Sequence, residues 1–320
     1  MADSNTTTFE LPNFVGELFQ KGQRENALLQ LIGGVHSGRV DQAATEFPVG
    51  QEYEVPAHDA DRSKVEGADA PAHTGVARSQ VTNVTQIVQE SVVVSYTKQA
   101  AHQQLAGLNV GGQSNPVTDE LDFQTGVKLE LIARNLNWAF INNEYRKPAT
   151  NAETRRTRGL LQAITSNIVN ATSGETAAPL ELGMFDDLMV SMIQAGGISD
   201  GDNVIALANT TQLRKLNELF RADKLKVDAE RFVGGVRVRT VYTTFGVLNF
   251  ALERDLPQDT IAVVNVDALG VVGTPVPGKG VLFREELAKT GANERYQLYG
   301  ELGFNHGPEW LHGKIVGLAV

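Results

Sequence analysis

Hydrophobic and polar residues alternate in two separate parts of the chain, as they do in β-strands that bury one face. The first part runs from residue 81 to about residue 95 and is rich in β-branched side chains, so we expect a strand there. The second part covers residues 287–304, where a turn at 290–293 separates two strand-like runs. The later run places Tyr296, Leu298, Leu302 and Phe304 on one side and Gln297, Glu301 and Asn305 on the other. We therefore expect a long hairpin with one apolar face and one polar face.

Helical periodicity is clearest over residues 116–147. Asn115 can cap this helix, Pro116 suits its first position, and Pro148 ends it. The expected apolar face, at spacings of three, four and seven, consists of Val127, Leu131, Trp138, Ile141 and Tyr145. At about 1.5 Å per residue the helix would be about 48 Å long, which is more typical of an elongated scaffold than of a globular enzyme domain.

The remaining elements are shorter and follow no regular order. A short helix is expected near residues 24–32, and others over 182–195 and from 210 or 211 to about 221. Strands are expected over 204–208, 236–241, 247–252, 261–266, 269–272 and 314–319. Helices and strands interleave without regular βαβ units and without an internal repeat, so the predicted fold class is α+β.

Two N-terminal segments do not show the pattern of a regular, packed domain. Residues 1–45 are predicted to form an irregular arm, apart from the short helix near its end. Residues 46–79 contain many Gly, Ala and Pro residues and cannot form a core of their own. Two interpretations of this second segment stay open, a disordered loop or an extended hairpin that lies on a neighbouring subunit.

Composition narrows the class of function. The chain has 320 residues, a net charge of −10 and no cysteine, which excludes thiolate catalysis, disulfides and zinc sites built on cysteine. The acidic balance argues against tight phosphate-dependent binding of nucleic acid. The N-terminus lacks the pattern of a signal peptide, and no apolar run is long enough to cross a membrane. The sequence thus predicts no export and no membrane partner.

Several motifs are tempting, but none predicts a site. Residues 197–201 match G-x-S-x-G, yet a helix precedes them and a strand follows, the reverse of a nucleophile elbow. Residues 273–280 resemble a phosphate loop without its hydroxyl or its helix. His306 and His312 lack the spacing of a metal site, so a surface or hydrogen-bonded role is expected for each. We therefore nominate no catalytic residue, no cofactor-binding residue, no metal ligand and no cofactor.

A run of basic residues could contact DNA or could bridge acidic residues of a neighbouring subunit, and the net charge of −10 favours the second interpretation. The run consists of Arg146, Lys147, Arg155, Arg156 and Arg158.

Taken in order, these pieces resemble the major capsid proteins of tailed bacteriophages, in the lineage with a late L-A-K-T-G-type hairpin. The resemblance covers residues from about 45 to 320, and its order and spacing carry more weight than any single motif. The matching positions are Asn83, Thr85, Gln86, Ile87, Ser95, Thr97, Arg158, Gly159, Leu160, Ala163, Ile164 and residues 287–292.

This resemblance implies the tailed-phage major capsid fold, which is also found in the floors of herpesvirus shells. Residues 1–45 would be the N-terminal arm, and residues 46–80 the E-loop. A P-domain strand and a spine helix would occupy 81–148, and the A-domain 149–257. The P-domain sheet and a C-terminal strand would occupy 258–320, and the last strand would be able to rejoin the A-domain.

The resemblance also implies a function, which is to form an icosahedral phage head of hexamers and pentamers around packaged double-stranded DNA. The chain would be a virion protein without enzymatic activity, assembled in the host bacterial cytoplasm, and scaffolding, portal and decoration proteins would be separate chains. Lys64 is the only lysine of the expected E-loop and hence its only candidate for a covalent link between subunits. Alternatives from the residues alone are another virion structural protein, such as a tail tube or decoration subunit, and an α+β ligand-binding protein or enzyme.

Overall fold

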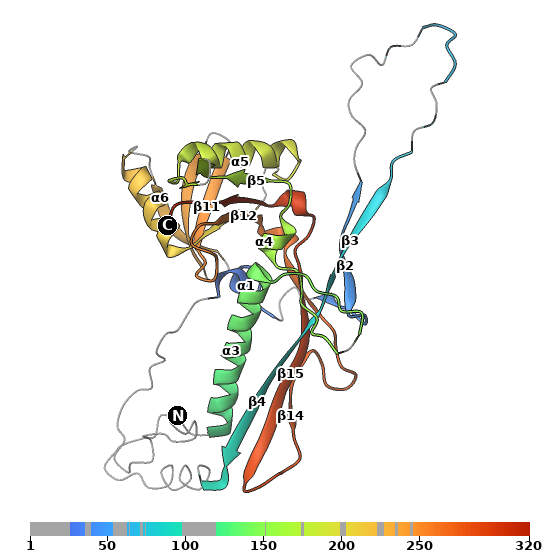
Figure 1. Ribbon diagram of the computed structural model, residues 1–320, viewed down its shortest axis with the longest axis vertical. Helices are drawn as coiled ribbons and strands as arrows, with labels where there is room; N and C mark the ends of the chain where they lie inside the picture. Colours follow the sequence, from blue (N-terminus) through green and yellow to red (C-terminus); the bar gives the residue numbers. More distant parts are fainter. Residues whose placement is uncertain are drawn as a thin grey trace.

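The chain is elongated, with two sheets that follow one another along its long axis and a hairpin that projects beyond them (Figure 1). This computed structural model describes residues 26–35, 40–53, 63, 65–70, 73, 75–97, 120–150, 152–173, 176–198, 203–222, 227–233, 236–243 and 246–320. The expected parts of the arm before residue 26, the start of the long helix and Lys64 lie outside these residues.

The first sheet is built around β15 (Asn293–Asn305), the second run of the expected hairpin. β15 pairs along one edge with β4 (Gln86–Ser95), antiparallel, from Asn293 opposite Ser95 to Leu302 opposite Gln86. Its other edge pairs with β14 (Leu282–Glu286) and β13 (Gly270–Gly273), and β13 pairs with β1 (Val40–Asp41). Leu298, Leu302 and Phe304 are buried, which confirms this part of the expected apolar face, whereas Tyr296 is only partly buried.

The long helix exists as α3 (Glu120–Asn142), which packs against β4 and β15. It ends five residues before the predicted end, because the chain after Asn142 pairs with 156–159 through Arg146 and Asn143 instead of continuing the helical ladder. The predicted apolar face was wrong in part. Ile141 is buried, but Val127 and Trp138 are 42% and 51% exposed. The buried face instead carries Ile132, Leu136, Ala139, Phe140 and Ile141.

The second sheet has seven strands in the order β5-β16-β12-β8-β11-β10-β9. Its side strands are β5 (Ile168–Asn170), β16 (Gly313–Val316), β11 (Gly246–Leu252), β10 (Val236–Thr243) and β9 (Val227–Val233). Its central strands, β8 (Val204–Ala208) and β12 (Ile261–Asn265), are buried throughout. In β8, Ile205 and Leu207 join the core that contains α3, whereas the alternate residues join the core under α5 (Leu182–Gln194) and α6 (Thr210–Ala222). A strand buried on both faces is continuously apolar, as these two are.

The sequence predicted α5, β8, α6, β10, β11 and β12 closely, and these elements are confirmed. It missed β9, which is the polar outer strand of a hairpin with β10. The expected boundary at 257/258 does not follow the sheets, because β12 pairs with β8 and β16 in the seven-stranded sheet. The last strand, β16, lies in this sheet, as expected for a strand that rejoins it.

Part of the expected arm is core rather than arm. α1 (Ala27–Leu31) packs between α3 and β10, and all of its apolar side chains are buried. Its amides are bound by distant side chains: Leu28 N donates to Glu253 Oε2 at 2.8 Å and Leu29 N to Asn137 Oδ1 at 3.0 Å. Within the expected arm, the described residues are therefore fixed to the body at α1 and again at β1 and do not form an irregular arm.

The projecting hairpin consists of β2 (Glu46–Tyr53) and β3 (Arg78–Val84), which pair antiparallel in a sheet of their own. The expected single strand over 81–95 was wrong, because Thr85 separates β3 from β4. Thr85 is buried, and its N–H donates to Thr45 O at 2.8 Å. The chain thus leaves one sheet and enters the other at this residue.

The remaining elements are short. They are α4 (Leu160–Ala163), the strands β6 (Thr172–Ser173) and β7 (Thr176–Ala177), and the 3₁₀ turns η2 (Val266–Ala268) and η3 (Glu309–Leu311). Among the described helices, none has both the length and the apolar character needed to span a membrane.

Candidate functional site

The motifs that resemble enzyme sites lie in structural connections. The phosphate-loop-like stretch leaves β13 and enters the strand β14, so no helix N-terminus faces it. Its Lys279 Nζ binds Glu285 Oε1 at 2.5 Å. The stretch at 197–201 follows α5 and precedes β8, and its Ser199 lies outside the described residues. Within the described ranges, no group of His, Asp and Glu side chains is arranged to hold a metal ion.

The most elaborate local structure lies where the hairpin β2–β3 joins the body, and we call it the hairpin base. Phe47 is 1% exposed and forms a small separate core with Val49 and Val272. Its ring lies directly over Gly303 of β15, where an added Cβ would lie 2.6 Å from Phe47 Cε1. Only a residue without a side chain leaves room for the Phe47 ring at this position, so Gly303 and Phe47 form one steric unit.

Asn83 fixes the other strand of the hairpin base. Its side chain is fully buried, and Nδ2 donates to Phe304 O at 2.8 Å. Oδ1 accepts from Arg158 N at 2.7 Å and from Val84 N at 2.8 Å. One amide therefore joins β3, β15 and the segment before α4 without leaving a buried polar atom unpaired.

The R-G-L motif at 158–160 has a steric explanation in the same region. A Cβ on Gly159 would lie 2.8 Å from both Asn143 N and Ile141 O. Gly159 N also donates to Asn143 O at 2.9 Å. The end of α3 and the start of α4 can therefore touch only if residue 159 has no side chain.

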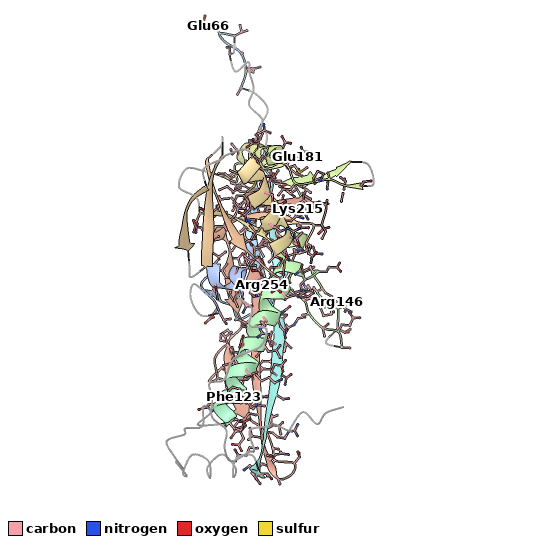
Figure 2. All side chains as sticks on the ribbon, turned by 90° about the vertical axis from the view of Figure 1, so that its left-hand side faces the viewer. Glu66, Phe123, Arg146, Glu181, Lys215 and Arg254 are labelled. Carbon is pink, nitrogen blue, oxygen red and sulfur yellow. The ribbon has the colours of Figure 1, made fainter. Side chains whose placement is uncertain are left out.

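Most of the basic run is paired within the subunit. Lys147 Nζ binds Glu46 Oε2 at 2.5 Å, Arg146 binds Glu153 at 2.6 Å, and Arg155 binds Glu301 at 3.1 Å. The hydrogen bond from Lys147 lowers the pKa of the Glu46 carboxyl, and Glu46 in turn raises the pKa of Lys147. Arg158 lies over the Tyr145 ring at 4.7 Å. These four side chains therefore have partners in their own chain, whereas contacts with a neighbouring subunit were the favoured expectation. Figure 2 shows Arg146 on a loop at the side of the molecule.

Beside the hairpin base lies the connection from β15 to β16, residues 306–312, which we call the histidine loop. His306 and His312 are 1% and 0% exposed, so a surface position is wrong, whereas the expected hydrogen-bonded role is confirmed. Burial lowers the pKa of each imidazole to about 4. Pro308 of this loop lies against Gly50 of β2, where an added Cβ would be 3.5 Å from Pro308 Cγ.

The far part of the hairpin contrasts with its base. Every side chain described between residues 63 and 80 is exposed, among them Val65 at 81%. Figure 2 places Glu66 at one end of the long axis and Phe123 of α3 toward the other. Of the two interpretations of this segment, the extended hairpin is therefore confirmed for the paired strands β2 and β3. A fixed base with an exposed far end can act as an arm for contacts with another molecule, but it presents no group for catalysis.

Sequence reasoning identified Asn83, Arg158 and Gly159 only as parts of a family motif, and it missed Phe47 and Gly303 as a pair. Phe47 stands 256 positions before Gly303, and nothing in the local pattern of either residue signals that they touch.

Comparison with known proteins agrees with this description. The sequence profile of the SU10 major capsid protein family matches residues 2–319. A sequence search of curated proteins finds no match. Among solved structures, the cyanophage A-1(L) capsid asymmetric unit is similar with a TM-score of 0.67 and 13% identity, over 98% of each chain.

Two further structures have the same fold. The capsid of a native GTA particle matches with a TM-score of 0.60 and 13% identity, over 100% of this chain and 99% of that one. The SrpI encapsulin of Synechococcus elongatus matches with a TM-score of 0.55 and 12% identity, over 93% of this chain and 96% of that one. At these identities the structural likeness establishes the fold, and the family match establishes the relationship.

Proposed function

Because this chain belongs to the SU10 major capsid protein family and is a structural subunit of an icosahedral phage head, we propose that its copies associate as hexamers and pentamers. The protein is a virion component, and its fold is the α+β fold of tailed-phage capsids. The residue-level question is which surfaces join the copies.

The observation that carries the proposal is the hairpin with its fixed base and exposed far end. The steric unit of Phe47 and Gly303 and the hydrogen bonds of Asn83 set the direction of the arm before any neighbour is present. An arm that is ordered in advance loses less conformational entropy when it binds. We assign it as the E-loop, lying on an adjacent copy of this chain.

The sheets support a revised division of the chain. The P-domain would comprise α3 and the sheet of β1, β4, β13, β14 and β15. The A-domain would comprise the seven-stranded sheet with α5 and α6. This division assigns β12 and β16 to the A-domain. The E-loop would extend to Val84, the end of β3, instead of ending at residue 80.

Exposed apolar side chains on the P-domain support contacts beyond the hairpin. Trp138 and Val127 on α3, and Ile87 and Val93 on β4, are each between 41% and 51% exposed. A shell buries more surface per subunit than a single contact does, and apolar area removed from water contributes about 25 cal/mol per Å². We infer that these side chains lie in contacts between copies.

The remaining parts of the proposal concern the content and the setting of the shell. It would enclose double-stranded DNA without reading its sequence, since the chain is acidic and most of the basic run is already paired. The subunit would have no enzymatic activity and would assemble in the host cytoplasm, and any scaffolding, portal or decoration proteins would be encoded separately. The family match supports a capsid subunit over the other classes, which are a ligand-binding protein, an enzyme, a tail tube and a decoration subunit.

The test compares the full-length chain with a variant in which an Asn-Gly turn replaces residues 54–77. A two-residue turn suits the direct pairing of Tyr53 with Arg78, so the hairpin base is kept. Each is expressed with and without the phage scaffolding protein and inspected by electron microscopy. We expect closed shells only from the full-length chain, and a variant with an unchanged circular dichroism spectrum that stays unassembled. Shells of equal yield from the variant would refute the role of the hairpin, and monomers alone from the full-length chain would refute hexamers and pentamers.

A further inference from the structure

The histidine loop connects three parts of the molecule. It begins at the end of β15 in the first sheet and ends at the start of β16 in the second. Its Pro308 lies against Gly50 of the hairpin β2–β3. A change in the conformation of this loop therefore affects both sheets and the hairpin base.

His312 is held in one protonation state by its two neighbours. Asn265 N–H, at the end of β12, donates to His312 Nδ1 at 3.2 Å, so this nitrogen must be unprotonated. The proton is then on Nε2, which donates to His306 O at 2.7 Å. A second proton on Nδ1 would face the Asn265 N–H and would break the bond between the loop and β12.

His306 has a similar restriction. Its Nδ1–H donates to Gly307 O at 2.7 Å, which leaves Nε2 as the unprotonated nitrogen. Nε2 is buried and has no hydrogen-bond partner among the described residues. A proton added there would be a buried donor without an acceptor, which a folded protein avoids by opening.

The charges around the two rings do not relieve this restriction. Arg158 and a protonated His312 both oppose a positive charge on His306, and Glu309 favours it. Among the described residues, Glu309 favours a positive charge on His312, and a protonated His306 opposes it. The Glu309 carboxylate is already engaged, because Oε2 accepts from Thr165 N, Ser166 N and Ser166 Oγ, each at 3.0 Å.

We propose that His306 and His312 make the histidine loop an acid-sensitive joint, whose protonation detaches the loop from β12 and frees the hairpin β2–β3 from the support of Pro308. The joint acts within one subunit, so its test does not depend on how subunits assemble. In a shell, the same event would change the angle of the arm that we assign to contacts between copies.

The direction of the pH effect follows from the two pKa values. Each folded pKa is about 4, below the ordinary 6.5, so the closed joint favours the neutral imidazoles. Their contribution is complete above about pH 6.5 and is lost as the pH falls toward 4. For an open state with an ordinary pKa, one histidine raises the opening equilibrium roughly thirtyfold between pH 7.5 and pH 5.0.

The experiment is amide hydrogen exchange of the full-length unassembled subunit at pH 7.5 and pH 5.0, with labelling times scaled for the intrinsic rate. We expect peptides within 46–53, 78–84 and 305–316 to lose protection at least tenfold at pH 5.0, while peptides of β8 do not. His73→Gln is the matched control, because His73 is exposed on the hairpin, and it should keep the full response.

The variants His306→Asn and His312→Gln keep a donor near Nδ1 and Nε2 respectively but cannot titrate. Each should reduce the response, and the double variant should abolish it. Equal protection of the wild type at both pH values would overturn the proposal, as would a double variant that still responds. If the double variant does not fold, exchange of the imidazole C2 hydrogens in the wild type decides, and a pKa above 6 for both histidines would overturn the proposal.

Discussion

Replacing Gly303 with Ala should disturb the packing of the hairpin base. The added Cβ would lie 2.6 Å and 2.9 Å from two carbons of the Phe47 ring and 3.2 Å from Val84 O. Carbon atoms in contact prefer about 3.5 to 4.0 Å, so the ring must move by about 1 Å. The ring is 1% exposed and is enclosed by Val49 and Val272, so it cannot move into solvent.

The expected cost follows from overpacking. Gly303→Ala should lower the free energy of unfolding by roughly 1 to 3 kcal/mol. Phe47→Leu, which shortens the ring, should cost roughly 1 to 2 kcal/mol, less than the loss of a whole aromatic side chain. In the double variant the shorter side chain makes room for the methyl, so the two costs should overlap by at least about 1 kcal/mol.

The assay is urea unfolding of the unassembled subunit, followed by circular dichroism, for the wild type and the three variants. Gly270→Ala is the control, because Gly270 lies in β13 of the same sheet and an added Cβ there meets nothing within 4 Å. It should change stability by less than about 1 kcal/mol. Additive costs of Gly303→Ala and Phe47→Leu, to within about 0.5 kcal/mol, would refute the steric unit.

Four other substitutions test parts of the fold on which the proposed function rests. Asn83→Ala should cost roughly 2 to 4 kcal/mol in urea unfolding, because it leaves Arg158 N and Phe304 O without this buried partner, and a cost under about 1 kcal/mol would contradict that role. Leu136→Ala should lower the free energy of unfolding by roughly 2 to 5 kcal/mol, because Leu136 of α3 is fully buried. Trp138→Ala, at a half-exposed position, should lower it by under about 1 kcal/mol in the unassembled subunit and should reduce shell yield instead. Equal losses of stability for the two variants would contradict this reasoning. Glu253→Ala removes the acceptor for Leu28 N, so hydrogen exchange at residues 27–31 should rise at least about fivefold, with exposed Asp187→Ala as the unchanged control and an unaffected rate as the refuting result.

The sequence predicted those elements in which the order of apolar and polar residues follows directly from which faces of the element are buried. β8 reads as a continuous apolar run because both its faces are covered, and β15 alternates because one face is covered. The end of α3 was predicted too late, because long-range pairing of Arg146 and Asn143 with 156–159 replaces the last helical bonds. Propensity within a window carries no information about such partners.

The face of α3 illustrates a second limit. Apolar periodicity shows that a side chain is buried somewhere, but not whether its own chain or another copy covers it. Val127 and Trp138 fit the predicted stripe and yet are exposed in the subunit, while Leu136 and Phe140 fill the core. Under the proposed contacts between copies, the apolar pattern would report both kinds of burial together.

The candidate site was the least predictable part. The hairpin base joins residues from five segments: β2, β3, β13, β15 and the segment before α4. Its glycine and asparagine differ from others in the chain only by the residues that they contact. The histidine pair was visible as His306 and His312, but sequence spacing does not show that Asn265 of β12 and Arg158 lie near them.

We propose that this chain builds a closed shell in which the hairpin β2–β3 lies on an adjacent copy. Cryo-electron microscopy of particles formed by the full-length chain tests this arrangement. We expect icosahedral particles of hexamers and pentamers, with residues 46–84 of each subunit in continuous contact with a neighbour. Particles in which this hairpin projects into solvent, or assemblies without hexamers and pentamers, would contradict it.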